Sequence, residues 1–430
     1  MKKIFSILVV IILAIAALGN IAMAQEEVTL LWGMWGDPAE IVTHQAVADA
    51  YMAQNPNVTI EIWSQPWGEY FTKIDTLFVG GDVTVIPDVF FMSPVQGRAA
   101  NGVLQNLDQF IEESGMEVGD YWPGTLESTS YEGSVYGFAR DIGIEVLYYN
   151  KDHFDAAGLD YPTDEWTWDD LRAAAEALTV QEASGRVSRY GLAMEGGKYS
   201  NFVVSNGGLI LDDMFNPTQC TLSQPEAVAG IEFFAGMMND EIAWRDANLG
   251  QAGGDLSVFL GEQTSMFIQN ASRVPALNAA GVNYDVAAVP TAPGGTRSAG
   301  SANGAAWVMS AMTDTPDAAW DFLLFLQSPE GGQAVYGSTG EIFPPTRSGA
   351  ESPVFLNPER GPEHKEAWIL GAESANILRD GWFPEWRELQ GTLIDPVLTS
   401  IWAGEAQPAD VLPGLCESVD AYLVEHGYGA

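Results

Sequence analysis

The sequence predicts an α/β protein of two lobes, each a mainly parallel sheet flanked by helices. With 430 residues, the chain is longer than one ordinary hydrophobic core requires. Strand and helix patterns alternate between residues 28 and 92, as in a parallel sheet covered by helices. Between Tyr131 and Phe154, two strand patterns follow one another without a reversing turn. The chain is therefore expected to pass there from one sheet into the next.

The N-terminus predicts export. Lys2 and Lys3 precede an apolar run from Ile4 to Leu18, and Ala22-Met23-Ala24 supplies small residues at a cleavage position. This is the pattern of a signal peptide over residues 1–24, cut after Ala24. The alternative, an uncleaved anchor, needs roughly 20 apolar residues. No cysteine stands directly after the apolar run, so a lipid anchor is not expected. The mature protein should lie in the periplasm or another extracytoplasmic space.

The charge balance disfavours several partners. Without Lys2 and Lys3, 16 of the 18 basic residues remain against 58 acidic ones, a net charge of −42. Such a surface repels nucleic acid and anionic membranes, so neither is expected as a partner. We expect a soluble monomer.

The first lobe begins with a strand at residues 28–32 and a turn at residues 33–36. Asp37 as N-cap and Pro38 at the first helical position then predict a helix. Its predicted apolar face consists of Ile41, Val42, Ala46, Val47, Ala50 and Tyr51. Further strands are expected at residues 58–62 and 89–92, with a helix from Glu69 between them.

The next elements include the predicted passage between sheets. One strand is expected at residues 134–138, and a second strand, with alternating apolar residues, is expected to end at Lys151. The polar residues 140–143 separate the two. Thr167 with Asp170 predicts a capped helix start. Residues 225–238 predict a helix, residues 290–300 a linker, and Thr315-Pro316 the start of another helix. The expected apolar faces are Leu171, Ala174, Ala175 and Leu178 in the first of these helices, and Ala319, Phe322, Leu323 and Leu326 in the last.

Several of these segments resemble the extracellular solute-binding proteins, family 1, of ABC importers, in particular the maltose-binding-protein-like carbohydrate branch. The family pattern G-x-x-Y-G-x-P…Y-Y-N-K-x-x-F-x-x-A-G-L…W-T-W-x-x-L matches residues 133–171, except that Ala139 or Arg140 replaces the usual proline. Residues 87–89, 101–108, 259–266 and 319–326 match further family motifs in the same order.

The resemblance implies a two-lobe periplasmic-binding-protein fold (type II, cluster D-like). Residues 25–139 and 300–343 would form the N-terminal lobe, and residues 140–299 and 344–430 the C-terminal lobe. Hinge crossovers would lie near 137–143, 290–302 and 340–347. Cys220 and Cys416 then fall in one lobe, where either a disulfide or two buried thiols would be compatible with export.

No catalytic signature is present. The sequence contains no nucleophile elbow, phosphate-binding loop or dinucleotide fingerprint. The histidines, expected to be solvated or capping, are too far apart in sequence to suggest a metal site, so neither a metal nor a cofactor is expected. They are His44, His153, His364 and His426. An exported glycoside hydrolase stays an alternative of another class, although 58 acids always provide some suitable carboxylate pair.

Sugar binding needs aromatic faces and planar polar groups. In the first lobe and hinge, the candidates are Trp35, Asp37, Trp67, Ser93, Arg140, Asp141 and Asn303. In the second lobe, they are Trp244, Asn270, Arg273 and Trp382. Each has a structural alternative: Trp35 and Trp67 could pack within the lobe, and Arg140 with Asp141 could form an internal ion pair. Asp88 is expected to be structural, and Trp307 and Trp320 to be core residues.

The resemblance implies that a sugar or oligosaccharide is held between the lobes and delivered to the transmembrane subunits of an ABC permease. The sequence departs from the family at residues 270–273, where many sugar binders carry a tryptophan. Arg140 and Arg273 could instead face an anionic group such as a glycerol phosphate. A third possibility is the same fold serving as the ligand-receiving subunit of a sensor.

Overall fold

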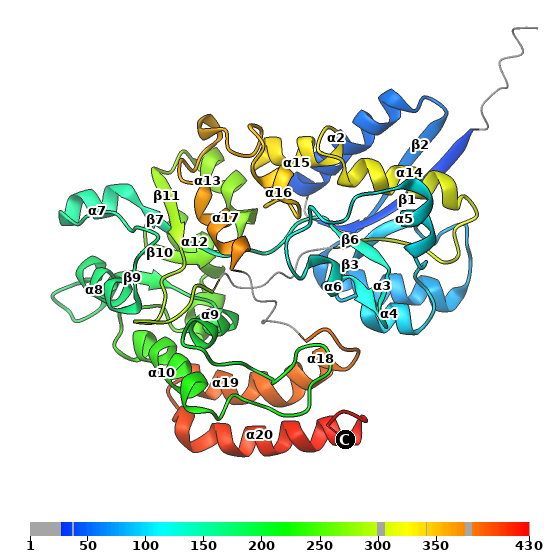
Figure 1. Ribbon diagram of the computed structural model, residues 1–430. Helices are drawn as coiled ribbons and strands as arrows, with labels where there is room; N and C mark the ends of the chain where they lie inside the picture. Colours follow the sequence, from blue (N-terminus) through cyan, green and yellow to red (C-terminus); the bar gives the residue numbers. More distant parts are fainter. Residues whose placement is uncertain (1–26, 37, 299–305, 341, 375–380, 430) are drawn as a thin grey trace, which may run out of the picture.

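The structure, a computed structural model, describes residues 27–429 except 37, 299–305, 341 and 375–380. The predicted signal peptide therefore lies outside the described residues. Two five-stranded sheets, each flanked by helices, form two lobes that lie side by side in Figure 1. This confirms the two-lobe α/β prediction. Among the described residues, no helix is both long and apolar enough to cross a bilayer.

The N-terminal sheet has the order β2-β1-β3-β12-β6. Its strands are β1 (Val28–Trp35), β2 (Val58–Gln65), β3 (Val89–Met92), β6 (Gly137–Ala139) and β12 (Ala306–Met309). The first three run parallel, and β12 is antiparallel to both β3 and β6. The helices of this lobe are α2 (Pro38–Gln54), α3 (Trp67–Gly80), α4 (Gln96–Ala100), α5 (Asp108–Ser114), α6 (Thr125–Ser128), α14 (Pro316–Gln327) and α15 (Gly332–Thr339).

Aromatic side chains dominate the core of this lobe. The rings of Phe91 and Trp307 stack at 3.9 Å between centroids, and Trp32 packs on Trp307 at 5.0 Å. Trp320 is also buried, and Asp88 accepts hydrogen bonds from the Leu31 amide and the Thr313 hydroxyl. The predictions for Trp307, Trp320 and Asp88 are confirmed.

Two local predictions for this lobe were wrong. The turn predicted at residues 33–36 is mostly strand, because β1 continues to Trp35 and pairs with β2 as far as Gln65. The buried face of α2 is also rotated from the predicted one: Val42 is 69% exposed and Ala46 is exposed. Val47 and Tyr51 are buried as predicted, and His44 and Ala48 are buried in place of Val42 and Ala46. The His44 ring packs inward because Tyr336 on α15 provides a hydrogen-bond partner, 2.7 Å away.

The C-terminal sheet has the order β11-β7-β10-β9-β8. Its strands are β7 (Val146–Asn150), β8 (Val180–Gln181), β9 (Val187–Ala193), β10 (Thr264–Gln269) and β11 (Tyr284–Ala288). Of the four pairs of neighbouring described strands, β9–β10 is parallel and the other three are antiparallel, so this sheet is mixed rather than mainly parallel. All five residues of β7 are buried, where the sequence predicted alternation. Helices cover both faces of the sheet, so neither face of β7 reaches solvent.

One short hairpin lies on the N-terminal lobe, and helices complete the C-terminal lobe. The hairpin strands are β4 (Ser130–Tyr131) and β5 (Ser134–Val135). The helices are α7 (Lys151–Ala157), α8 (Trp168–Leu178), α9 (Tyr199–Ser205), α10 (Pro225–Asn239), α11 (Asp246–Gln251), α12 (Gly254–Leu260), α13 (Val274–Ala280), α16 (Arg347–Ala350), α17 (Glu366–Glu373), α18 (Trp386–Leu389), α19 (Asp395–Trp402) and α20 (Pro408–Glu425).

A helix cap and a disulfide stabilise parts of the C-terminal lobe. The capping box predicted at Thr167 and Asp170 is confirmed at the start of α8. Cys220 and Cys416 form a disulfide, which ties α20 to the loop before α10 across 196 residues of sequence. The sequence alone left open whether these cysteines are joined.

Candidate functional site

The two sheets present their ends to each other at the first connection between the lobes. β6 belongs to the N-terminal sheet and β7 to the C-terminal one, and the six residues 140–145 join them. Six residues span at most about 20 Å. The prediction that the chain passes here from one sheet to the next is confirmed. Side chains at these two strand ends can therefore act on one molecule.

Residues from three parallel-running strands meet at the N-terminal side of this junction. Trp35 ends β1, Ser93 follows β3, and Arg140 follows β6. The half-buried Trp35 ring stacks on Phe91 at 4.6 Å and packs against Tyr70 at 5.3 Å. Trp35 therefore takes part in lobe packing while it also reaches the strand edge.

Arg140 and Asp141 form an ion pair at this edge. Their Nη2 and Oδ2 atoms are 2.5 Å apart, and both side chains are largely buried. The Arg140 guanidinium also lies over the Phe91 ring at 4.9 Å, and Gln333 donates a hydrogen bond to the Arg140 carbonyl. Arg140 and Asp141 thus form the internal ion pair that the sequence offered as the alternative to ligand binding. Asp141 offsets the charge of Arg140.

His44 lies behind this edge and is not solvated, contrary to the prediction. Its ring contacts Trp32, Phe91 and Trp307 edge-on. Burial, together with the nearby positive charge of Arg140, holds the pKa of His44 well below its ordinary value. His153 is buried as well, with Nδ1 3.1 Å from the Ser265 hydroxyl. Both imidazoles serve as structural groups.

A buried polar network forms the C-terminal side of the junction. The Lys198 ammonium lies 2.5 Å from Glu145 Oε1 and 2.8 Å from Gln269 Oε1. Asn201 donates to the second oxygen of Glu145 at 2.5 Å. Gln269 ends β10 and pairs in register with Val146, so the network lies at the end of β7 from which the connecting segment arrives.

This network extends to further charged side chains. Gln269 donates to Asp255 at 3.0 Å and to the half-buried Glu195 at 3.5 Å. Sequence reasoning missed all of these residues, because they come from four separate segments and form no local motif. Of the carboxylates in this network, Glu145 and Asp255 are buried, whereas Glu195 is partly exposed. A carboxylate such as that of Glu195 can accept hydrogen bonds from a polyhydroxylated molecule.

Asn270 and Arg273 lie beside this network. The Asn270 side-chain oxygen accepts bonds from the amide and hydroxyl of Ser272, at 3.1 and 2.6 Å, and so caps the following turn. Arg273 Nε lies 3.3 Å from Asp255 Oδ1. The buried Asp255 therefore offsets the charge of Arg273.

The two tryptophans predicted to bind ligand from the C-terminal lobe lie away from the polar network around Lys198 and Gln269. Trp244 Nε1 donates to the carbonyl of Gln263, which precedes β10 and thus lies at the opposite end of that strand from Gln269. Trp382 is 5% exposed in the lobe core, near Phe215. Their placement does not support the predicted ligand contacts. Asp37, Asn303 and the side chain of Trp67 lie outside the described residues.

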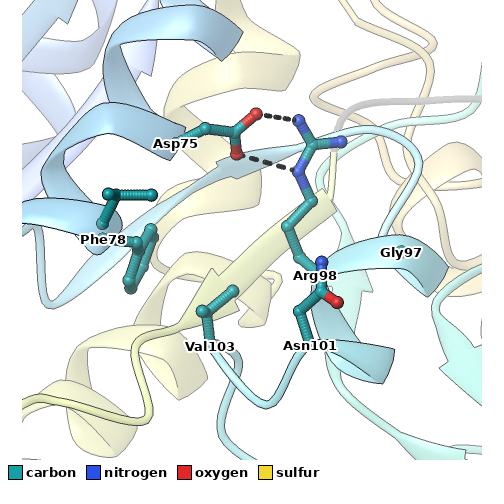
Figure 2. Close-up of a pocket in the computed structure, with 7 residues that line it drawn as sticks. Asp75, Phe78, Gly97, Arg98, Asn101 and Val103 are labelled. Carbon is teal, nitrogen blue, oxygen red and sulfur yellow. Dashed lines mark hydrogen bonds and ion pairs between the residues drawn. The ribbon is translucent and has the colours of Figure 1, made fainter.

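A separate pocket of about 440 Å³ lies on the N-terminal lobe between α3 and α4 (Figure 2). Arg98 closes one side of it with a two-pronged ion pair to Asp75. None of the predicted site residues lines this pocket. Its lining residues are Asp75, Phe78, Val79, Gly97, Arg98, Asn101 and Val103. In the described part of the chain, no three His, Cys, Asp or Glu side chains are grouped so that they could hold a metal ion.

Comparison with known proteins places this geometry in context. A family profile described as "Bacterial extracellular solute-binding protein" matches residues 46–361. The chain is 24% identical to the putative binding protein BAB2_0491 of Brucella abortus strain 2308, with 88% of this chain and 89% of that protein aligned. It is 23% identical to the galactooligosaccharide-binding protein of Bacillus subtilis strain 168, with 87% and 86% aligned.

Solved structures share the fold. The substrate-binding protein Lmo0181 of Listeria monocytogenes, in complex with cycloalternan, superposes with a TM-score of 0.78 at 21% identity, covering 93% of this chain and 100% of that one. The sugar-binding protein MalE of Xanthomonas citri superposes with a TM-score of 0.75 at 20% identity, covering 93% and 98%. The predicted two-lobe binding-protein fold is confirmed.

Proposed function

The chain belongs to the bacterial extracellular solute-binding proteins, and we propose that it is the substrate-binding component of an ABC importer. It captures a sugar or oligosaccharide between its lobes and delivers it to the transmembrane permease subunits. It does so by binding alone, without catalysis. The observation that carries this proposal is that the aromatic edge around Trp35 and the polar network around Lys198 and Gln269 lie at the strand ends joined by residues 140–145.

The chemistry of the two edges favours a neutral polyol. A tryptophan ring packs against the C–H face of a sugar, and carboxylate and amide groups accept or donate bonds to its hydroxyls. The relatives support the same class, since one is a galactooligosaccharide-binding protein and another a maltooligosaccharide solute-binding lipoprotein. A glycerol phosphate is less favoured, because Asp141 and Asp255 offset the charges of Arg140 and Arg273.

The proposal includes the location and division of the chain. Export to the periplasm or another extracytoplasmic space, with cleavage after Ala24, would place the protein where its ligand arrives. The N-terminal lobe would comprise residues 25–139 and 300–343 and the C-terminal lobe residues 140–299 and 344–430, with three crossovers acting as hinges. A ligand closes such lobes only by its extra affinity for the closed form.

Titration of the mature protein tests the function. Galactooligosaccharides, maltooligosaccharides and sn-glycerol 3-phosphate would be added while tryptophan fluorescence and thermal unfolding are followed. A ligand at 100 times its dissociation constant adds about 2.7 kcal/mol to the free energy of unfolding. We expect a saturable response to one of the oligosaccharides, with the sugar recovered intact.

A matched pair of variants locates the response. Trp35→Leu keeps an apolar side chain but removes the stacking face, and we expect it to weaken binding at least about tenfold. Trp166→Phe, at a half-buried tryptophan against α7, serves as the control and should leave affinity unchanged. Release of reducing ends would instead establish a hydrolase, and a response to glycerol phosphate alone would establish an anion carrier. Absence of any response would overturn the sugar proposal.

A further inference from the structure

One arginine of the C-terminal lobe contacts the N-terminal lobe directly. Arg387 lies on α18, which approaches α6 of the other lobe in Figure 1. Its Nη2 atom donates a hydrogen bond to the Ser93 carbonyl at 3.2 Å, immediately after β3. Its guanidinium also lies over the Phe71 ring of α3, 5.4 Å from the centroid. A single side chain thus reaches two elements of the opposite lobe.

The segment that carries Arg387 is also bonded to the end of its own lobe. Glu385, two residues before Arg387, accepts a hydrogen bond from the Tyr428 hydroxyl at 2.8 Å. Across the lobe boundary, burial and the negative charges of Glu132 and Glu385 raise the pKa of Tyr131 in the β4–β5 hairpin. Glu385 is therefore bonded within its own lobe and carries a negative charge near Tyr131.

The receiving groups on the N-terminal lobe suit a guanidinium in particular. A carbonyl oxygen and the face of an aromatic ring both attract a cation, and the flat guanidinium can satisfy both at once. Arg98 lies over the same Phe71 ring, at 5.7 Å, and Asp75 holds Arg98 in place (Figure 2). The Phe71 ring that contacts Arg387 is thus also packed against Arg98 of its own lobe.

We propose that Arg387 is a lobe latch, a positioning residue that holds the two lobes in the arrangement seen here through the Ser93 carbonyl and the Phe71 ring. The latch acts between protein groups and involves no ligand. It therefore goes beyond the proposed function, and it can be tested on the protein alone.

The test measures the distance between the lobes in the ligand-free mature protein. Thr76→Cys on α3 and Ser418→Cys on α20 introduce exposed positions for nitroxide labels, one in each lobe, with the native disulfide kept oxidised. Double electron–electron resonance then reports the distance distribution. For Arg387→Ala, we expect the ratio of long to short distances to rise about five- to tenfold, because a cation–π contact and a charge-assisted hydrogen bond are lost together.

Two further variants separate a latch from a general effect. Arg387→Lys keeps the charge but not the flat fork, and it should restore part of the short-distance population. Arg186→Ala removes an equal charge from a surface ion pair with Glu182 within the C-terminal lobe, and it should match the wild type. Unchanged circular dichroism would establish that all variants are folded.

Two results would overturn the latch. The first is a distance distribution for Arg387→Ala that superimposes on that of the wild type. The second is a distance distribution for Arg186→Ala that shifts as far as that for Arg387→Ala. Neither depends on whether a sugar binds, so failure of the latch and failure of the proposed function remain distinguishable.

Discussion

At the scale of single residues, burial decides which charged side chains stabilise the fold and which are accessible to a ligand. Lys198 and Glu145 are almost fully buried and satisfy each other together with Gln269 and Asn201. Desolvating two charges is costly, and the pair is stable only because each partner keeps its bonds. Their value is to hold Gln269 in a fixed position at the strand edge.

We expect Lys198→Met to lower the free energy of unfolding by about 3–5 kcal/mol, because it leaves the buried Glu145 carboxylate without its cation. Urea unfolding followed by circular dichroism measures the change. The double variant Lys198→Met with Glu145→Gln should recover a good part of the loss, since it removes the uncompensated charge. If the free energy of unfolding of Lys198→Met equals that of the wild type within experimental error, the ion pair does not stabilise the fold by this amount.

His44 predicts a pH dependence of stability. The folded state holds the pKa of His44 well below its ordinary value of 6.5, whereas the unfolded chain takes up a proton near that value. Below pH 6.5 the unfolded state thus binds more protons, and the folded state loses stability as the pH falls. The loss approaches about 1.4 kcal/mol per pH unit.

Comparison with His44→Gln isolates the contribution of His44 to the pH dependence of stability, because glutamine does not titrate. From about pH 7 to pH 5, the wild type should lose stability faster than the variant does. His426→Gln, at an exposed histidine, serves as the control and should follow the wild type. Parallel curves for wild type and His44→Gln would contradict the assignment.

At the scale of elements, most ends and connections follow from local chemistry. The capping box at Thr167 starts α8, and Pro316 starts α14. The C-terminal helix α20 is different, because a covalent bond between Cys416 and Cys220 fixes it to a distant loop. The same loop is held by a hydrogen bond from the Cys220 amide to Asp420 on α20.

Replacing both cysteines by serine should lower the free energy of unfolding by about 2–4 kcal/mol, because the long loop closed by the disulfide is freed in the unfolded chain. Thermal unfolding of the oxidised wild type and the double variant measures this effect. Wild type treated with a reductant should approach the variant, and the variant itself should not respond to reductant. Equal stability of all three samples would show that α20 is held by packing alone.

At the scale of the whole molecule, the net charge of −42 expected after export dominates long-range behaviour. The acids are spread over both lobes and repel one another in the compact state. Such a charge is expected to repel nucleic acid and anionic membranes.

We expect the melting temperature to rise by several degrees between 0.01 M and 1 M NaCl, as the screening length falls from about 30 Å to about 3 Å. Differential scanning calorimetry measures the shift. Sodium sulfate at equal ionic strength is the control: screening predicts the same curve, whereas a general salting-out effect would make sulfate stronger. A melting temperature that is flat or falling with NaCl would contradict charge repulsion as a major term.

The sequence alone determined the features that depend on neighbouring residues. Strand and helix periodicity, helix caps and the order of family motifs predicted two α/β lobes, the passage from β6 to β7, and the core roles of Trp307 and Trp320. These follow from local conformational preference and from burial of apolar side chains, which leave a readable period in the chain.

The tertiary structure alone decided the contacts between distant segments. Glu145 and Lys198 are 53 residues apart, and Arg387 meets Ser93 across 294 residues. Trp244 lies at the wrong end of β10 for its predicted role, and α2 turns His44 inward toward Tyr336. No local period records such pairings, because which polar side chains meet is fixed by how the sheets and lobes pack. The fold could therefore be predicted from the sequence, whereas the contacts of the candidate site could be identified only from the structure.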